Sequence, residues 1–296
     1  HDGFEREAQA RCEVILSAGS IASPQILERS GIGSGERLRE HGVDVVHELP
    51  GVGENLQDHY VARFCCRAKD VETFNERARG ARLGWEILRY AFKRTGLLTT
   101  APGNVSASLK VMPGVATPDV QFAFAPASYV EGQLGVLDKF PGMTCGIWQH
   151  RPASRGSIHM VATDPEVQPT IRPNYLSDRI DQETIVGGLR KARELFAQPT
   201  LAKFVDVETV PGPDVQTDDE LLDFARQTGS TVFHPIGTCK MGTDPMAVVD
   251  PELRMHGLNG LRVVDASVMP LMPSANTNAA VLMIAEKAAD MIKAAN

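Results

Sequence analysis

The 296-residue sequence has few cysteines and no pairing pattern among them. The five cysteines are an odd number and show no CxxC spacing; they are Cys12, Cys65, Cys66, Cys145 and Cys239. A disulfide framework or a zinc site requires paired or clustered cysteines. We therefore expect free thiols in a reducing compartment, no metal site and a cytoplasmic location.

Long apolar runs and an excess of positive charge are also absent. No run reaches the roughly 18 apolar residues of a membrane span, and the start does not resemble a signal peptide. The chain has 30 basic and 37 acidic residues, a net charge of −7, and no Lys/Arg cluster changes this balance. These features exclude an electrostatic nucleic-acid binder and indicate a globular chain long enough for two domains.

An initiator methionine is missing too. The chain begins "HDGFEREAQARCEVILSAG", and Asp2–Gly3 is typical of a hairpin turn. Because a hairpin should not begin at its own turn, we expect the C-terminal part of a longer protein. The alternative is a trimmed natural N-terminus.

Both ends of the sequence have an α/β pattern. "CEVILSAG" predicts a buried parallel strand, and "SPQILERSGIG" predicts a helix with Ser23 as N-cap, Pro24 in the first position and Gly31 at its end. Near the C-terminus, "LNGLRVVDASVMP" predicts another buried strand, and an alanine-rich helix follows it. In open α/β sheets, ligands bind beyond the carboxyl ends of such strands.

The middle of the chain is rich in strands. "YVARFCCRAK", "NVSASLKVM", "DVQFAFAP", "MTCGIWQHR" and "GSIHMVAT" alternate with Pro/Gly punctuation, and Arg151 to Gly156 predicts a hairpin. Residues 81–96 predict an amphipathic helix, residues 181–198 and 217–227 two further helices, and Trp85 and Trp148 are expected in the core. We expect domain boundaries at 1–62, 63–225 and 226–296, the outer two pieces forming one domain.

Two short segments carry the candidate chemistry. In "TVFHPIGTCKMG", His234 lies between Phe233 and Pro235, and a histidine held in a restricted backbone suits proton transfer near neutral pH. In "SANTNAAVLMIAEKAADMI", Asn276 and Asn278 lie where a helix N-cap belongs, with no charge nearby. The asparagines either cap the helix only, or leave its positive end facing an anion.

Six blocks in order resemble one known family. They are "GSIASPQILERSGIG", "GVGENLQDH", "RPASRGSIHMVATDP", "IRPNYLSD", "HPIGTCKMG" and "LRVVDASVMPLMPSANTNAAVLMIAEKAADMI". Over nearly its whole length the chain resembles the C-terminal portion of glucose–methanol–choline (GMC) flavoprotein oxidoreductases, most closely the choline-dehydrogenase-like alcohol dehydrogenases. The resemblance implies the C-terminal pieces of a Rossmann-like FAD-binding domain, together with an α+β substrate domain built on an antiparallel sheet.

The same resemblance implies site residues by position. His234 matches the family's catalytic histidine, and Asn276 matches its second active-site position, which is His or Asn. The cofactor FAD would be contacted by Ala18 and Gly19 near the adenosine half, by Asp265 and Ala266 at the ribityl chain and diphosphate, by Thr277 and Asn278 at the pyrimidine edge, and by Phe233 beside the substrate. The implied reaction is oxidation of an alcohol, with His234 as general base and hydride transfer to flavin N5.

Two departures from the family pattern limit these expectations. No GxGxxG cradle is present, because "SGIGSG" and "GVGENL" have the wrong spacing; the cradle is expected on the missing N-terminal segment, as a second chain. Asn104 stands where choline-specific relatives carry a glutamate, which favours an uncharged primary alcohol as the small-molecule substrate. A redox-silent flavin lyase and a non-catalytic substrate-binding subunit remain alternative hypotheses.

Overall fold

The computed structural model describes residues 6–101, 103–130, 133 and 135–295, so the expected turn at Asp2–Gly3 lies outside the described residues. The chain divides into two compact units. The first unit comprises residues 1–58, 151–177 and 233–296, and the second comprises residues 59–150 and 178–232. Residues 151–177 thus pack in the first unit, whereas the sequence analysis places them in the substrate domain.

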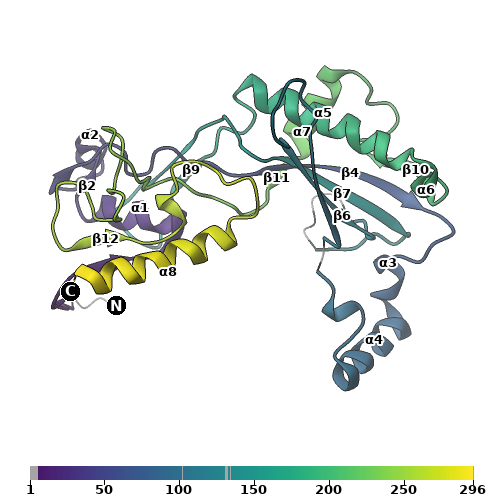
Figure 1. Cartoon of the computed structure of the whole chain (residues 1–296), viewed down its shortest axis with the longest axis horizontal. Coiled ribbons are helices and arrows are strands. Elements are labelled where there is room, and N and C mark those ends of the chain that lie inside the picture. Colours follow the sequence, from purple (N-terminus) through teal and green to yellow (C-terminus); the bar gives the residue numbers. More distant parts are fainter. Residues whose placement is uncertain (1–5, 102, 131–132, 134, 296) are drawn as a thin grey trace. The chain divides into compact units, whose positions relative to one another are not determined.

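The first unit has the expected α/β character (Figure 1). Strand β1 (Val14–Leu16) runs parallel to β12 (Leu261–Val263), with Val14 opposite Leu261. Around this pair lie the strands β2 (Ile32–Gly33), β3 (His47–Glu48), β8 (Ser157–His159) and β9 (Thr170–Arg172), and the helices α1 (Gly19–Arg29), α2 (Gly35–Glu40), η2 (Ala266–Val268) and α8 (Asn278–Ala295). Its core gathers buried side chains from distant segments, among them Leu27, Ile236, Val248, Val263 and Ile284.

Strand β1 is parallel as predicted, but the prediction that it is buried is wrong. Val14 and Ile15 are 55% and 44% exposed. β1 pairs with β12 alone among the strands of the described residues. An interior parallel strand has a neighbour on each side, and both of its faces are covered. β1 has the apolar sequence of such a strand, but its side chains are exposed to solvent in this chain.

Helix α1 begins earlier than predicted, which corrects the assignment of Ser23 as its N-cap. The helix starts at Gly19, so Pro24 lies inside it. A proline has no N–H to donate to the carbonyl four residues earlier, here that of Ser20. The Thr238 hydroxyl donates to that carbonyl at 2.7 Å instead, which allows the helix to tolerate its internal proline.

The second unit is built on the predicted antiparallel sheet. Its strand order is β10-β4-β7-β6-β5, and β11 pairs with the start of β4. The strands are β4 (Tyr60–Ala68), β5 (Val105–Leu109), β6 (Val120–Ala125), β7 (Gly142–Gln149), β10 (Val205–Val210) and β11 (Ser230–Thr231). Trp148 on β7 is buried as expected, 6% exposed. The helices of this unit are α3 (Phe74–Arg77), α4 (Gly80–Lys93), η1 (Leu97–Thr99), α5 (Arg179–Phe196), α6 (Pro199–Ala202) and α7 (Asp218–Thr228).

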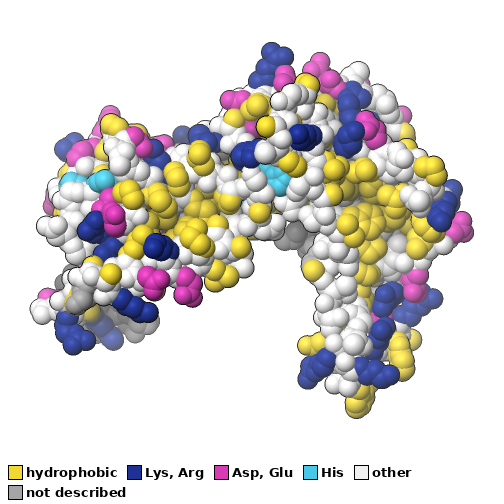
Figure 2. Space-filling model, in the orientation of Figure 1, with side chains coloured by type: hydrophobic (Ala, Val, Ile, Leu, Met, Phe, Trp, Pro, Cys, Tyr) yellow, Lys and Arg dark blue, Asp and Glu magenta, His cyan; other side chains and the backbone are white. Residues whose placement is uncertain are grey.

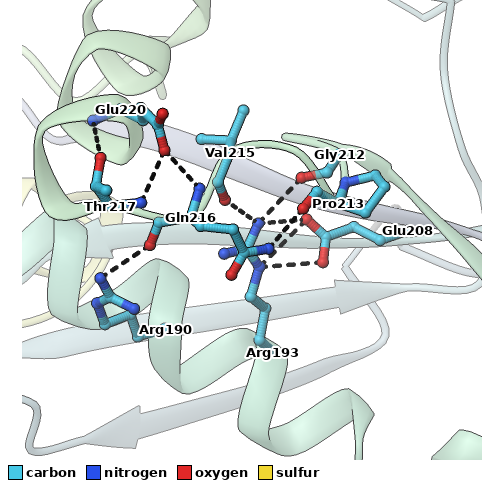
Figure 3. A network of polar contacts seen from close by, with 9 residues as sticks. All are labelled: Arg190, Arg193, Glu208, Gly212, Pro213, Val215, Gln216, Thr217 and Glu220. Carbon is cyan, nitrogen blue, oxygen red and sulfur yellow. Dashed lines mark hydrogen bonds and ion pairs between the residues drawn. The ribbon is translucent and has the colours of Figure 1, made fainter.

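A polar network joins α5 and the start of α7 to the edge strand β10 (Figure 3). Arg193 on α5 donates to both carboxylate oxygens of Glu208 on β10, and to the carbonyls of Gly212 and Val215 at 3.1 and 2.7 Å. Thr217 and Glu220 form a capping box at the start of α7, because each side chain satisfies the backbone N–H group of the other residue. The guanidinium therefore fixes the loop from which α7 begins.

Two further predictions are wrong. Residues 151–156 form no hairpin: β7 pairs with β4 and β6, and β8 pairs with β9. Instead, the Arg155 guanidinium binds the carbonyls of Pro152, Ala153 and Ser154, which curls the segment around it. Trp85 on α4 is 67% exposed rather than in the core.

Candidate functional site

The expected base, His234, is half-buried in an irregular segment of the first unit. Phe233 before it has a φ of 63° and a side chain that is 69% exposed. The His234 backbone N–H donates to Asp58 Oδ1 at 2.9 Å, and the Tyr175 hydroxyl donates to Asp58 Oδ2. This buried carboxylate fixes the backbone from which the imidazole projects.

Burial and charge act in opposite directions on His234. Burial lowers the pKa of the imidazole, and the negative charge of Asp58 raises it; burial is the larger effect, so the pKa lies below its ordinary value. A lowered pKa keeps the ring neutral near neutral pH. A neutral imidazole is the form that can accept a proton.

Residues 55–58 hold two distant segments at once, and we call them the clamp. The Gln57 backbone pairs with Ile236 through hydrogen bonds of 3.1 and 2.9 Å, two residues beyond His234. Its buried side chain donates to the Pro270 carbonyl and accepts from the Met272 N–H, both at 3.0 Å. The clamp therefore fixes the segment that bears His234 and the segment that leads to Asn276.

The approach of the clamp to the His234 segment requires glycine at one point. Gly237 has a φ of +92°, and a Cβ there would lie 2.5 Å from the Asn55 carbonyl oxygen. Asn55 itself has a φ of 61° and donates to the carbonyl of Gly237 at 3.3 Å. The glycine of "HPIG" is thus required by backbone conformation and by space.

Helix α8 begins two residues after Asn276, which corrects the assignment of its cap. The Val281 N–H donates to the Thr277 carbonyl at 2.9 Å, so Thr277 occupies the cap position. Asn276 precedes the cap and is exposed, Thr277 is buried, and Asn278 is the first residue of the helix. The first turn carries no acidic residue, so the positive end of the helix is not neutralised from within.

The predicted residues Ala18, Gly19, Asp265 and Ala266 lie on two segments that hydrogen bonds join at the carboxyl ends of β1 and β12. Asp265 Oδ2 accepts from the Gly19 N–H at 2.9 Å and from the Ser23 hydroxyl at 2.6 Å. Asp265 Oδ1 accepts from the Ser267 N–H at 2.7 Å. Ser23 Oγ in turn accepts from the Ala18 N–H at 3.1 Å. The carboxylate is therefore committed to protein donors and ties the two strand ends together.

These joined strand ends fit the rim of a dinucleotide site. Gly19 has a φ of +82°, and a Cβ placed there would meet nothing within 4 Å. The first turn of α1, which starts at this glycine, also carries no acidic residue. A ligand could thus approach this backbone closely, as it does at the strand ends of open α/β folds.

Sequence reasoning missed the residues that support the site. No short sequence pattern marks Gln57, Asp58 or Tyr175 for this role. Asp58 holds the His234 backbone, while the adjacent His59 has its Nε2 3.0 Å from the His150 carbonyl oxygen. All nine predicted site residues lie in the first unit.

Two negative findings concern the described part of the chain. None of its helices combines the length and hydropathy needed to cross a bilayer. No group of three or more His, Cys, Asp or Glu side chains in the described ranges is placed to hold a metal ion.

Comparison with known proteins gives matches to two family models, in chain order. Residues 1–61 match the N-terminal model of the GMC oxidoreductases, and residues 152–285 match the C-terminal model. The chain is 42% identical to an alcohol dehydrogenase [acceptor] of Pseudomonas putida over 95% of its own length and 51% of the relative's. It is also 42% identical to an oxygen-dependent choline dehydrogenase of Pseudomonas putida GB-1, over 99% of its own length and 52% of the relative's.

Solved structures agree with these matches. The FAD-bearing formate oxidase of Aspergillus oryzae superposes with a TM-score of 0.88 at 26% identity, covering 97% of this chain and 55% of that protein. The chain spans about half the length of the relatives it matches. Because it matches both family models and shares the fold of a solved member, the chain belongs to the GMC oxidoreductases, a family of enzymes whose cofactor is FAD.

Proposed function

We propose that this chain supplies the catalytic residues of an FAD-dependent enzyme that oxidises a primary, uncharged alcohol to an aldehyde. The observation that carries the proposal is the clamp, since residues 55–58 fix both the His234 segment and the segment leading to Asn276. A base and a carboxamide on two segments held by one support are suited to bind the same hydroxyl group.

His234 acts as the general base in this proposal. Its lowered pKa keeps the imidazole neutral and ready to take the proton of the substrate hydroxyl. Asn276 binds the same hydroxyl without competing for its proton, because a carboxamide both donates and accepts hydrogen bonds but does not ionise. Bound FAD would accept the hydride from the substrate carbon at N5.

Residues around the strand ends and at the start of α8 would hold the cofactor. Ala18, Gly19 and Ala266 present backbone at the strand ends, and Asp265 keeps that backbone in place. The start of α8, at Thr277 and Asn278, would offer backbone N–H groups to the electron-rich edge of the flavin, because its first turn carries no acidic residue. A helix N-terminus stabilises such charge by about 0.3–1 kcal/mol, and by up to about 2 kcal/mol when partly buried.

The dinucleotide cradle comes from elsewhere in this proposal. The chain carries no GxGxxG after a strand, and the exposed β1 has room for a further strand neighbour. A segment bearing that motif, as a second chain, would complete the parallel sheet and cradle the FAD diphosphate.

The proposal of an uncharged substrate rests on the family resemblance, in which Asn104 stands where choline-specific relatives carry a glutamate. Asn104 stands immediately before the edge strand β5, and its N–H donates to the Phe124 carbonyl at 2.8 Å. The carboxamide offers no negative charge to a quaternary ammonium. We therefore expect small primary alcohols to be preferred over choline, and Asn104→Glu to move that preference towards choline.

The test uses the complex purified from cells. Mass spectrometry of whatever copurifies with the chain should identify a GxGxxG-bearing segment, and the visible spectrum should show oxidised flavin. Anaerobic addition of a short primary alcohol should bleach that spectrum. A flavin that remains yellow with every alcohol would contradict the redox proposal and support a lyase.

A further inference from the structure

Helix α4 (Gly80–Lys93) is attached to its unit through polar groups rather than apolar ones. Its one buried residue is Glu86, whose carboxylate pairs with Arg77 at 2.5 Å and accepts from the Leu97 N–H at 2.8 Å. At 3.6 residues per turn, Arg82, Glu86, Arg89 and Lys93 share an arc of about 60°. A surface helix normally buries its apolar stripe and exposes the polar one; here the arrangement is reversed.

The apolar arc of this helix is exposed to solvent. Trp85 is 67% exposed and Phe92 83% exposed. The large apolar side chains of the helix that are exposed are Trp85, Ile87, Leu88, Tyr90 and Phe92. Figure 2 shows hydrophobic and basic side chains side by side at this helix, where α4 stands in Figure 1. A patch of this kind on a folded protein marks an interaction surface.

The charge around this arc is positive, although the whole chain is acidic. Residues 79–94 contain five basic residues, Arg79, Arg82, Arg89, Lys93 and Arg94, and one acidic residue, Glu86, for a net charge of +4 in a chain of net charge −7. Arg89 and Lys93 line a surface pocket together with Trp85, Leu88 and Phe92. The Arg94 guanidinium lies 4.9 Å from the centre of the Tyr90 ring. An apolar surface bordered by cations complements a surface that is apolar inside and anionic at its rim.

Two other groups of exposed apolar side chains have a different setting. On α8, Leu282 and Met283 are each 60% exposed, and the acidic Glu286 and Asp290 lie on the same helix. On β1, Val14 and Ile15 belong to a strand with an open edge, which suits another strand. Helix α4 alone among these three combines an exposed tryptophan and tyrosine with a basic border. Trp and Tyr favour the headgroup level of a bilayer, where one end of the ring is apolar and the other is wet.

We propose that α4 is a peripheral membrane-docking helix, which lies in the plane of an anionic phospholipid surface with Leu88 and Phe92 inserted at the boundary between headgroups and acyl chains and Trp85 at the headgroup level. The features that identify such helices are a wide apolar face, basic residues on the polar face and bulky aromatic anchors. This inference does not depend on the redox activity proposed above. It predicts that the chain binds reversibly to membranes without spanning them.

The experiment uses Trp85 as its own reporter. The chain has two tryptophans, and Trp148 is buried while Trp85 is exposed. Titration with vesicles containing phosphatidylcholine and 30% phosphatidylglycerol should shift the emission to shorter wavelength, and the chain should cosediment with them. Vesicles of phosphatidylcholine alone, and high salt with anionic vesicles, should bind it far less.

Surface variants separate specific docking from general stickiness. Arg89→Glu/Lys93→Glu should lower the partition coefficient at least about thirtyfold, since each basic residue near an anionic surface contributes roughly 1 kcal/mol. Phe92→Ser should also abolish most binding, while Ile180→Ser, at a 50% exposed position on α5, should leave it unchanged. All these side chains lie on the surface, so the variants should remain folded, which circular dichroism checks. Failure of the chain, alone and in its copurified complex, to bind anionic vesicles would overturn the proposal, as would protection of Trp85 by a protein partner or a second copy without lipid.

Discussion

The carboxylate of Asp265 offers a quantitative test of how the strand ends are held. Asp265→Ala leaves the N–H groups of Gly19 and Ser267 and the hydroxyl of Ser23 without their acceptor. Each unsatisfied buried donor costs about 1–3 kcal/mol. The alanine also removes a buried carboxylate and its desolvation cost, and the hydroxyl can rotate. We therefore expect the first unit to lose about 2–5 kcal/mol of unfolding free energy.

Asp265→Asn provides the matched variant. Its single amide oxygen can still accept from the donors of one of the two original carboxylate oxygens, so we expect about half of the loss in unfolding free energy. Asp44→Ala, at an exposed aspartate of the same unit, should stay within about 0.5 kcal/mol of the parent chain.

The two units can be followed separately in one urea titration. Both tryptophans lie in the second unit, so fluorescence monitors that unit, and hydrogen–deuterium exchange of peptides from β12 and α1 monitors the first. Asp265→Ala should shift the exchange transition to lower urea and leave the fluorescence transition in place. If Asp265→Ala and Asp44→Ala shift the exchange transition equally, the carboxylate does not hold the strand ends.

Two further predictions concern titrating groups. Asp58→Asn keeps an acceptor for the His234 N–H but removes the charge that raises the pKa of His234; the acid limb of alcohol-driven flavin reduction should therefore move to lower pH, and a pH–rate profile of the holo-complex that does not move would contradict the coupling. Burial lowers the pKa of His159, but its contacts with Glu28 and Glu54 outweigh burial and raise the pKa above 6.5. The contribution of His159 to the unfolding free energy should accordingly be full below pH 6.5 and should decline as the pH rises through the folded pKa of His159. The unfolding free energies of His159→Gln and the parent chain, measured by urea titration, should therefore converge at alkaline pH. A difference that stays constant with pH would refute this.

Most of the local structure could be predicted because it depends on near neighbours. The helix α7 begins at a capping box written in four consecutive residues, Thr217 to Glu220. The strands of the antiparallel sheet were marked by Pro and Gly on either side. The identity of the site residues came from the family resemblance, and their roles stay a prediction.

The failures arose where a distant segment satisfies a local need. Ser23 was expected to cap a helix, but its hydroxyl donates to Asp265, 242 positions away. Pro24 was expected at a helix start, and the Thr238 hydroxyl permits it inside the helix. Gln57 and Tyr175 support the site through contacts that no short-range pattern announces.

Exposure was the second source of error. Val14 and Trp85 have large apolar side chains of the kind that is usually buried. The residue type indicates that such a side chain favours burial, but it does not indicate which surface buries it. For β1 we propose a further strand from the cradle-bearing segment, and for α4 a lipid surface.

The central claim is that His234 is the base that takes the hydroxyl proton of an alcohol. Anaerobic stopped-flow measurement of flavin bleaching in the copurified complex tests it, with His234→Ala compared against the parent and with cofactor content measured in both. The account predicts that His234→Ala keeps its flavin but is reduced at least about a hundredfold more slowly, the usual contribution of a general base. Reduction at the parental rate in a flavin-loaded His234→Ala complex would contradict the claim.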